Sequence, residues 1–231
     1  MSNRLIQIQQ RNEHLQALIH RVTVNSNYLY NANLLLDEQV GFLAEHCQHV
    51  LDFGKSSRHR YDLFRPDQIT TVDINQFENY PDIIDDICDL QHIQPDSYDG
   101  VICMAVLEHV YDPQQAVKNI YNTLHSGGYC LAYLPFLYRY HAPDDFTFQD
   151  YFRFTRDGIA YLFRDFASVV LYPYRGPYST IFNLWEPWKS RIENKRYGPR
   201  INQIIDKIGI FLNSKVNHKN QASGYYVWAI K

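Results

Sequence analysis

Two acidic residues and a glycine stand where short apolar segments end. Asp52 and Gly54 belong to the end of the apolar run at 49–53, and Asp73 lies at the end of the run at 69–74. In an open α/β sheet, ligands bind at the carboxyl ends of the strands. A glycine there lets the backbone approach a ligand closely, and an acid about 20 residues after the turn can accept hydrogen bonds from both hydroxyls of a ribose. The spacing therefore predicts a site for a ligand that contains ribose.

A second group of reactive side chains lies in residues 135–157, which are rich in aromatic, histidine, acidic and arginine residues. His141 is a candidate general base, because a histidine can exchange a proton near neutral pH. Arg153 can bind an anionic ligand, or it can pair with Asp145 or Asp150. Tyr138 and Asp145 complete the predicted set of substrate-binding residues.

The segments that must position these groups alternate between strands and helices. Residues 1–46 have apolar side chains at helical spacing. From there on the apolar pattern predicts seven strands, at 49–53, 69–74, 83–88, 98–104, 129–134, 166–172 and 225–230. Such alternation predicts a doubly wound α/β fold with a seven-stranded, mostly parallel sheet. We expect the last strand to be antiparallel.

The chain of 231 residues is expected to form a single domain. Its parts are an N-terminal helical segment (1–46), a core for ligand binding (47–134) and two insertions (135–157 and 173–224). We expect the N-terminal helices and the insertions to cap the carboxyl ends of the strands, because long excursions often carry function. Asp37 is a candidate N-cap for the second helix, and Thr155 for a helix after the first insertion.

Composition argues against several classes of partner. The formal net charge is −3, so no nucleic acid is expected as a partner. No apolar run approaches the ~20 residues of a membrane span, and the four cysteines form no C-x-x-C pair. We therefore expect reduced, buried thiols, a cytoplasmic location and no metal site. An oligomer is possible.

Several motifs occur in a familiar order between residues 48 and about 157. They are VLDFG, the acid in TVDI, DDICDL, PDSYDGVICMAVLEHV and LHSGGYCLAYLPF. In order and spacing they resemble the motifs of class I S-adenosylmethionine-dependent methyltransferases, and the type 11 group in particular. The resemblance implies a Rossmann-like methyltransferase fold, S-adenosylmethionine as cofactor and methyl transfer as the activity.

The resemblance also implies roles for individual residues. The turn after the first strand would line the methionine moiety, Asp73 would hold the ribose, and Asp86 would accept from the adenine amine. Glu108 is expected to be a structural hydrogen-bonding residue, with His109 beside it as a second candidate base. The complete set of predicted cofactor-binding residues is Asp52, Gly54, Ser56, Asp73, Ile74, Asp86, Ile87, Met104 and Ala105.

The chain departs from this family in its glycine-rich turn, where Ser56 replaces the second glycine. The Cβ of serine restricts left-handed backbone conformations. The alternative function is therefore a non-catalytic methyltransferase-like protein that serves as a binding or scaffold protein. For Asp52, bracing the loop is the alternative role, and Asp85 and Asp89 are alternatives to Asp86.

Two other nucleotide-binding folds fit the sequence less well. Gly54-Lys55-Ser56 is similar to the end of a phosphate-binding P-loop, but His49 stands where that motif needs its first glycine. The dinucleotide-binding motif G-x-G-x-x-G is incomplete.

The acceptor of the methyl group is expected to be an oxygen or a nitrogen of a small molecule or a glycan precursor. The run YRYHAPDDFTFQDYFRFT resembles a feature of methyltransferases that are encoded with surface-polysaccharide genes.

Overall fold

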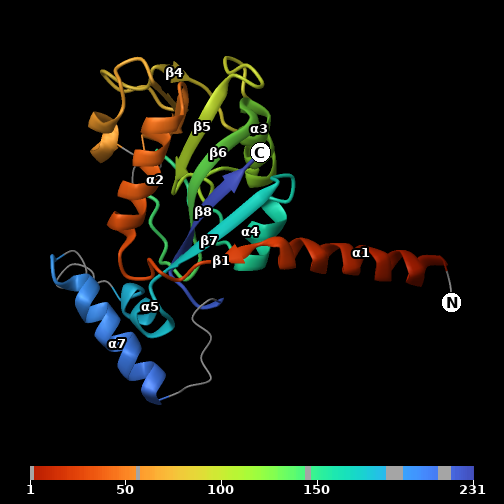
Figure 1. The fold of residues 1–231 in the computed structure, drawn as a ribbon, viewed down its shortest axis with the longest axis vertical. Coiled ribbons are helices and arrows are strands. Elements are labelled where there is room, and N and C mark those ends of the chain that lie inside the picture. Colours follow the sequence, from red (N-terminus) through yellow and green to blue (C-terminus); the bar gives the residue numbers. More distant parts are fainter. Residues whose placement is uncertain (1–2, 56–57, 144–146, 186–194, 213–219) are drawn as a thin grey trace.

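The computed structural model describes residues 3–55, 58–143, 147–185, 195–212 and 220–231. Its core is one sheet in the order β1-β7-β8-β6-β5-β2-β3-β4 (Figure 1). Its strands are β1 (Thr23–Val24), β2 (Val50–Phe53), β3 (Ile69–Asp73), β4 (Ile83–Ile84), β5 (Tyr98–Met104), β6 (Leu124–Pro135), β7 (Ser168–Tyr174) and β8 (Gly224–Ile230). The helices are α1 (Asn3–Arg21), α2 (Ala32–His46), the 3-10 helix η1 (Arg58–Leu63), α3 (Pro113–Thr123), α4 (Arg156–Leu162), α5 (Pro177–Asn183) and α7 (Gly198–Leu212).

The predicted α/β class and mostly parallel sheet are confirmed, as is the antiparallel last strand. β8 runs antiparallel to both of its neighbours, β6 and β7. The predicted count of seven strands was wrong by one, because β1 pairs in parallel with β7 inside the segment that was expected to be helical. Its two β-branched residues lie between two helices, too few to give a periodic signal.

The strand predicted over 83–88 ends after Ile84. The chain turns at Asp85, whose carboxylate accepts backbone hydrogen bonds from Asp86, Gln91 and His92. Within the predicted strand, the amide of Asp86 thus bonds to Asp85 and the amide of Cys88 bonds to Oδ1 of Asp86, so both are satisfied locally and not by a neighbouring strand.

Both faces of the sheet are covered, as a doubly wound fold requires. On one face, α2 packs Leu43 against Val50 and Ile102. On the other face, α3 and α4 pack against Leu51 and Val101. Alternate residues of a strand point to opposite faces, so the adjacent pairs Val50–Leu51 and Val101–Ile102 serve the two clusters. All four cysteines are buried and free, as predicted.

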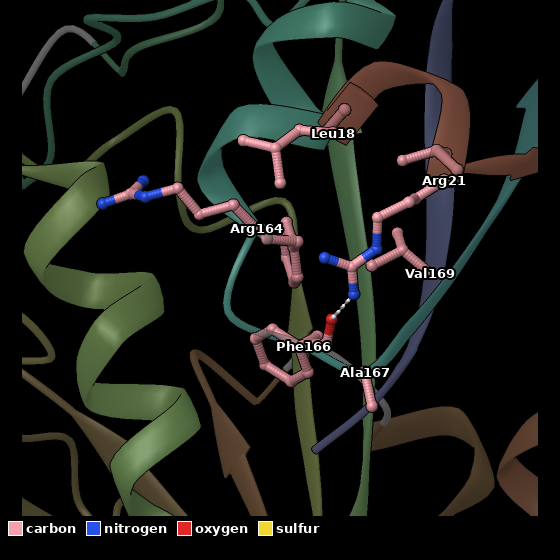
Figure 2. Close-up of a pocket in the computed structure, with 9 residues that line it drawn as sticks. Leu18, Arg21, Arg164, Phe166, Ala167 and Val169 are labelled. Atoms are coloured by element: carbon pink, nitrogen blue, oxygen red, sulfur yellow. Dashed lines mark hydrogen bonds between the residues drawn. The ribbon is translucent and has the colours of Figure 1, made fainter. Parts of the chain in front are cut away.

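The N-terminal helix does not cap the carboxyl ends of the strands. α1 extends away from the body of the molecule (Figure 1), and Leu18 is its buried residue. Beside Leu18 and Val169, the Arg21 guanidinium donates to the carbonyl of Phe166 at 3.5 Å (Figure 2). The hollow there measures about 20 Å³, which is room for about one water and too small for a ligand. No helix within the described ranges is long and apolar enough to span a bilayer.

One predicted helix cap is confirmed and one is wrong. The Thr155 hydroxyl accepts from the amide of Gly158 at 3.0 Å, which caps α4. α2 begins five residues before Asp37, and its cap is Asn31, whose side chain accepts from the amide of Leu34. Asp37 instead lies inside the helix.

A buried carboxylate joins two helices of the second insertion. Asp206 of α7 accepts hydrogen bonds from the amides of Gly176, Tyr178 and Ser179, at 2.8–3.1 Å. These amides belong to the first turn of α5, which has no side-chain cap of its own. The link holds α5 and α7 together directly after β7 ends, at the edge where the predicted site residues lie.

Candidate active site

The carboxyl ends of β2 and β5 form a backbone cradle. Gly54 has φ +75° and Lys55 has φ +50°, while Ala105 at the end of β5 has φ +56°. A Cβ on Gly54 would lie 2.8 Å from Cγ2 of Val106, so only glycine fits where the two turns meet. The turns therefore approach each other closely beside Met104 and Ala105. Ser56 lies outside the described residues.

Asp73 ends β3 next to this cradle. Its Oδ1 accepts from the amide of Asn75 at 2.9 Å, and its Oδ2 accepts from the hydroxyl of Tyr80 at 3.0 Å. A carboxylate has about four acceptor sites, so these bonds fix its orientation and leave capacity for a ribose. The ammonium group of Lys55 lies over the ring of Tyr80, 4.7 Å from the centroid. This contact joins the turn after β2 to the segment that follows β3.

Asp52 differs from Asp73 in being fully buried. Its Oδ2 accepts from the hydroxyl of Tyr61 in η1 at 2.6 Å. This geometry favours the bracing role, in which Asp52 fixes the segment that follows the cradle.

Among the three neighbouring acids after β4, the geometry favours Asp86 as the adenine acceptor. Asp85 is buried and bound to backbone amides, and Asp89 is exposed with its Oδ1 accepting from the Gln91 side chain. Asp86 is half-buried, and its Oδ2 accepts from the exposed Tyr111 hydroxyl at 3.2 Å. The two predicted apolar contacts differ, since Ile87 is buried and Ile74 is 62% exposed.

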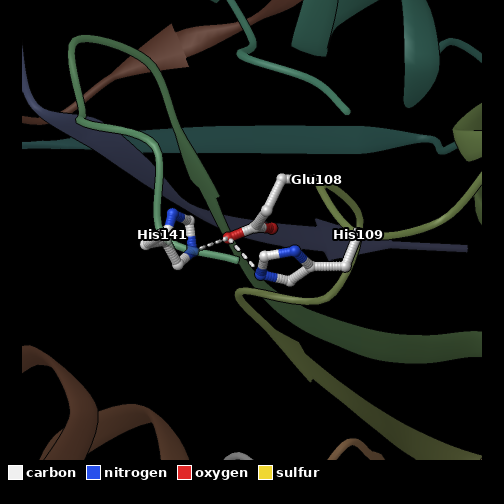
Figure 3. Close-up of side chains that lie close together, drawn as sticks. All are labelled: Glu108, His109 and His141. Atoms are coloured by element: carbon white, nitrogen blue, oxygen red, sulfur yellow. Dashed lines mark ion pairs between the residues drawn. The ribbon is translucent and has the colours of Figure 1, made fainter. Parts of the chain in front are cut away.

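A cluster of Glu108, His109 and His141 lies beyond the end of β5 (Figure 3). Oε1 of Glu108 is 3.8 Å from Nε2 of His109 and 3.8 Å from Nε2 of His141. The structure thus brings the two predicted catalytic histidines together, with their rings 4.8 Å apart.

Glu108 is not the structural hydrogen-bonding residue that we expected. Its side chain is 1% exposed, and neither carboxylate oxygen has a hydrogen-bond partner within the described part of the chain. Burial raises the pKa of Glu108 to about 8, while the charge of Arg153 opposes the rise. Burial also lowers the pKa of His109. No signal in the sequence distinguishes this carboxylate from an ordinary loop acid.

The first insertion holds the cluster in place. The Nδ1 atom of His109 is 2.5 Å from the carbonyl oxygen of Gln149, and that of His141 is 3.1 Å from Oδ2 of Asp150. The amides of Tyr151 and Phe152 both donate to the carbonyl of Glu108. Although burial opposes ionisation of Asp150, hydrogen bonds from Arg153 and from the amide of His141 lower its pKa to about 2.

Arg153 holds segments of the first insertion together through its hydrogen bonds. Its guanidinium donates to the carboxylate of Asp150 and to the carbonyls of Tyr138, Arg139 and Phe152. An arginine has five N–H donors, and all five are engaged. Of the two predicted roles, the geometry therefore favours ion pairing over substrate binding. Asp145 lies outside the described residues.

An open cavity of about 710 Å³ meets the cluster and the cradle. Glu108, His141 and the predicted substrate residue Tyr138 line it, together with Ala105 of the cradle. The remaining wall, which sequence reasoning missed, comes from the start of α2, from strand ends and from the second insertion: Asn33, Tyr133, Pro135, Tyr174, Arg175, Lys195, Arg196, Pro199 and Tyr226. A cavity of this volume is typical of small-molecule sites.

Residues 51–132 match a family described as a methyltransferase domain, Methyltransf_11. No curated protein matches the chain. A solved S-adenosylmethionine-dependent methyltransferase from Archaeoglobus fulgidus is 17% identical, with a TM-score of 0.54, over 87% of this chain and 93% of that chain. Phosphoethanolamine N-methyltransferase 2 from Haemonchus contortus, in complex with S-adenosyl-L-methionine, is 15% identical, with a TM-score of 0.51, over 87% of this chain and 52% of that chain.

These findings show the fold of the chain. The chain has the Rossmann-like fold of class I S-adenosylmethionine-dependent methyltransferases, and the matched domain family uses S-adenosylmethionine as its cofactor.

Proposed function

We propose that this protein transfers a methyl group from S-adenosylmethionine to an oxygen or a nitrogen of a small molecule or glycan precursor. The observation that carries the proposal is the single cavity that joins Ala105 of the cradle to Glu108 and His141. A cofactor in the cradle and an acceptor in the cavity would meet where groups able to handle a proton converge.

The cofactor is assigned to the edge formed by β5, β2, β3 and β4. Asp73 accepts from the ribose hydroxyls, and Asp86 accepts from the adenine amine. The turns at Gly54–Lys55 and Met104–Ala105 enclose the methionine end. Two unusual backbone conformations and a position that excludes any Cβ support this assignment.

Methyl transfer is an in-line displacement that mainly requires positioning. A lone pair of the acceptor attacks the methyl carbon, the bond from that carbon to the sulfonium sulfur breaks, and S-adenosylhomocysteine leaves as a neutral thioether. A hydroxyl or ammonium acceptor must also lose a proton. We assign assistance of that loss to His141, because it lines the cavity and its ring is oriented by Asp150.

The cavity wall supports a polar acceptor of small size. Four tyrosines, at 133, 138, 174 and 226, supply aromatic surface with hydroxyl groups. Arg175, Lys195 and Arg196 add positive charge on the side of the second insertion. A sugar or glycan precursor that carries a phosphate or carboxylate suits this combination of stacking surface and cations.

Calorimetric titration of the purified protein with S-adenosylmethionine and S-adenosylhomocysteine tests the proposal. We expect one site per chain with a Kd in the micromolar range. No detectable heat from a folded sample would contradict the proposal and favour the non-catalytic alternative.

A further inference from the structure

Three atoms that accept hydrogen bonds face one another beside the cavity. They are an oxygen of Glu108 and the Nε2 atoms of His109 and His141, all within 4.8 Å of one another. The carboxylate is buried and has no hydrogen-bond donor within the described ranges. A buried carboxylate without a partner is costly, so the fold tolerates it only where something else compensates it.

The surroundings of the two histidines fix which nitrogen of each ring carries the proton and which one presents a lone pair to Glu108. Nδ1 of His109 is adjacent to the Gln149 carbonyl, which can only accept, so Nδ1 carries the proton. Nδ1 of His141 lies between the Asp150 carboxylate and the Arg139 carbonyl, two further acceptors. Each neutral imidazole therefore directs the lone pair of its Nε2 toward Glu108.

A single proton does not satisfy this arrangement. If one proton is shared between Glu108 and one histidine, the Nε2 lone pair of the other histidine still faces an acceptor oxygen. A cation that accepts several lone pairs at once satisfies all three groups. The histidine environment is also that of metal ligands, which characteristically donate their other ring N–H to a carboxylate or a backbone carbonyl.

We propose that Glu108, His109 and His141 bind one divalent first-row transition metal ion, such as zinc, at the wall of the cavity. Two imidazoles and one carboxylate are a ligand set that zinc and iron(II) favour, with a remaining position open to water or substrate. In a tetrahedral site with bonds of about 2.1 Å, ligand atoms are about 3.4 Å apart. The two distances from Glu108 to the histidines, 3.8 Å each, need only a small contraction of the side chains to reach this value, and the two Nε2 atoms lie within 4.8 Å of each other.

The open coordination position faces the cavity, because both Glu108 and His141 line it. What the ion does there rests on the proposed function. An acceptor hydroxyl bound at that position loses its proton more easily, since a divalent ion lowers the pKa of bound oxygen groups. With the ion bound, His141 assists the loss of the acceptor's proton as a ligand of the ion and not as the base, and the proton passes to water.

The test uses untagged protein that has been treated with a chelator and then titrated with cobalt(II). Cobalt bound in a site with four or five ligands gives visible absorption, so binding is read without any assay of activity. We expect one cobalt per chain, displaced by zinc. Glu108→Gln, His109→Gln and His141→Gln should each weaken cobalt binding at least 10-fold. His14→Gln, on the exposed face of α1, is the matched control and should bind as the wild type does.

Two outcomes would overturn the inference. One is a wild-type protein that binds no cobalt or zinc up to millimolar concentration, which would leave only protons in the cluster. The other is cobalt binding that all three substitutions leave unchanged. Because calorimetry with S-adenosylhomocysteine is run on the same samples, failure of the metal site and failure of the cofactor site are distinguished.

Discussion

The imidazole of His141 links Asp150 to Glu108. Its Nδ1 lies 3.1 Å from Oδ2 of Asp150, and its Nε2 lies 3.8 Å from Oε1 of Glu108. The backbone amide of His141 also donates to Asp150 at 2.9 Å. Asp150 therefore fixes both the backbone position and the ring orientation of His141, although the two residues are nine positions apart in the sequence.

Substitution of Asp150 should disturb the metal site and spare the cofactor site. For Asp150→Asn we expect cobalt affinity to fall about 10- to 100-fold, as is typical for loss of a partner behind a ligand. The affinity for S-adenosylhomocysteine should not change, because the partners of Asp150 in the described part of the chain are His141 and Arg153. Asp157→Asn, at the exposed start of α4, is the control. Unchanged cobalt affinity in Asp150→Asn would show that the carboxylate does not orient His141.

Arg153 should contribute to stability more than to substrate binding. Arg153→Ala leaves the buried side chain of Asp150 without its ion-pair partner, so the free energy of unfolding should fall by about 2–4 kcal/mol. Urea denaturation measures this. If the variant were as stable as the wild type and only the KM for the acceptor rose, Arg153 would be a substrate ligand after all.

The sequence predicted the strands well because their apolar runs are long and bounded by polar turns. It also predicted that Asp73, Gly54 and the two histidines lie at or after strand ends, which is where the structure has them; their roles stay predictions. Spacing along the chain could not predict the role of Arg153, because this depends on five acceptors that the first insertion brings together only when it folds.

Roles that depend on burial could not be predicted from the sequence either. Glu108 has the same sequence context whether its carboxylate is hydrogen-bonded or left without a donor. β1 was missed because a strand of two residues is too short to show an alternating apolar pattern. The cavity wall from the second insertion depends on Asp206, which looks like any polar residue of an amphipathic helix.

Chelator-treated protein should lose stability as the pH rises through the range in which Glu108 is held protonated. The pKa of Glu108 is about 8 in the folded protein and about 4.3 in the unfolded chain. Between these values the folded state binds the extra proton, so the free energy of unfolding falls as the pH rises and levels off above pH 8. For Glu108→Gln this component is absent.

The wild type and Glu108→Gln should therefore be similarly stable at pH 5. At pH 9 the free energy of unfolding of Glu108→Gln should be higher than that of the wild type by about 2–4 kcal/mol. Urea denaturation at the two pH values, with a chelator present, measures the difference. A difference that is the same at both pH values would mean that Glu108 titrates normally.

The backbone cradle should not tolerate a side chain at Gly54. Gly54→Ala adds a Cβ at φ +75° and 2.8 Å from Val106, so we expect a loss of about 1–3 kcal/mol in stability and weaker binding of S-adenosylhomocysteine. Gly41→Ala in α2 is the matched control, because a Cβ there meets nothing within 4 Å and alanine favours a helix. Equal behaviour of the two variants would contradict the cradle.

The measurement that tests the account most directly is the affinity of Asp73→Ala for S-adenosylhomocysteine, compared by calorimetry with Asp67→Ala, an exposed acid in the loop before β3. The account predicts that Asp73→Ala loses about 1.5–3 kcal/mol of binding free energy, the usual contribution of hydrogen bonds to a charged group, and that Asp67→Ala loses none. A folded Asp73→Ala that binds as tightly as the wild type would contradict it, because the ribose would then be held elsewhere.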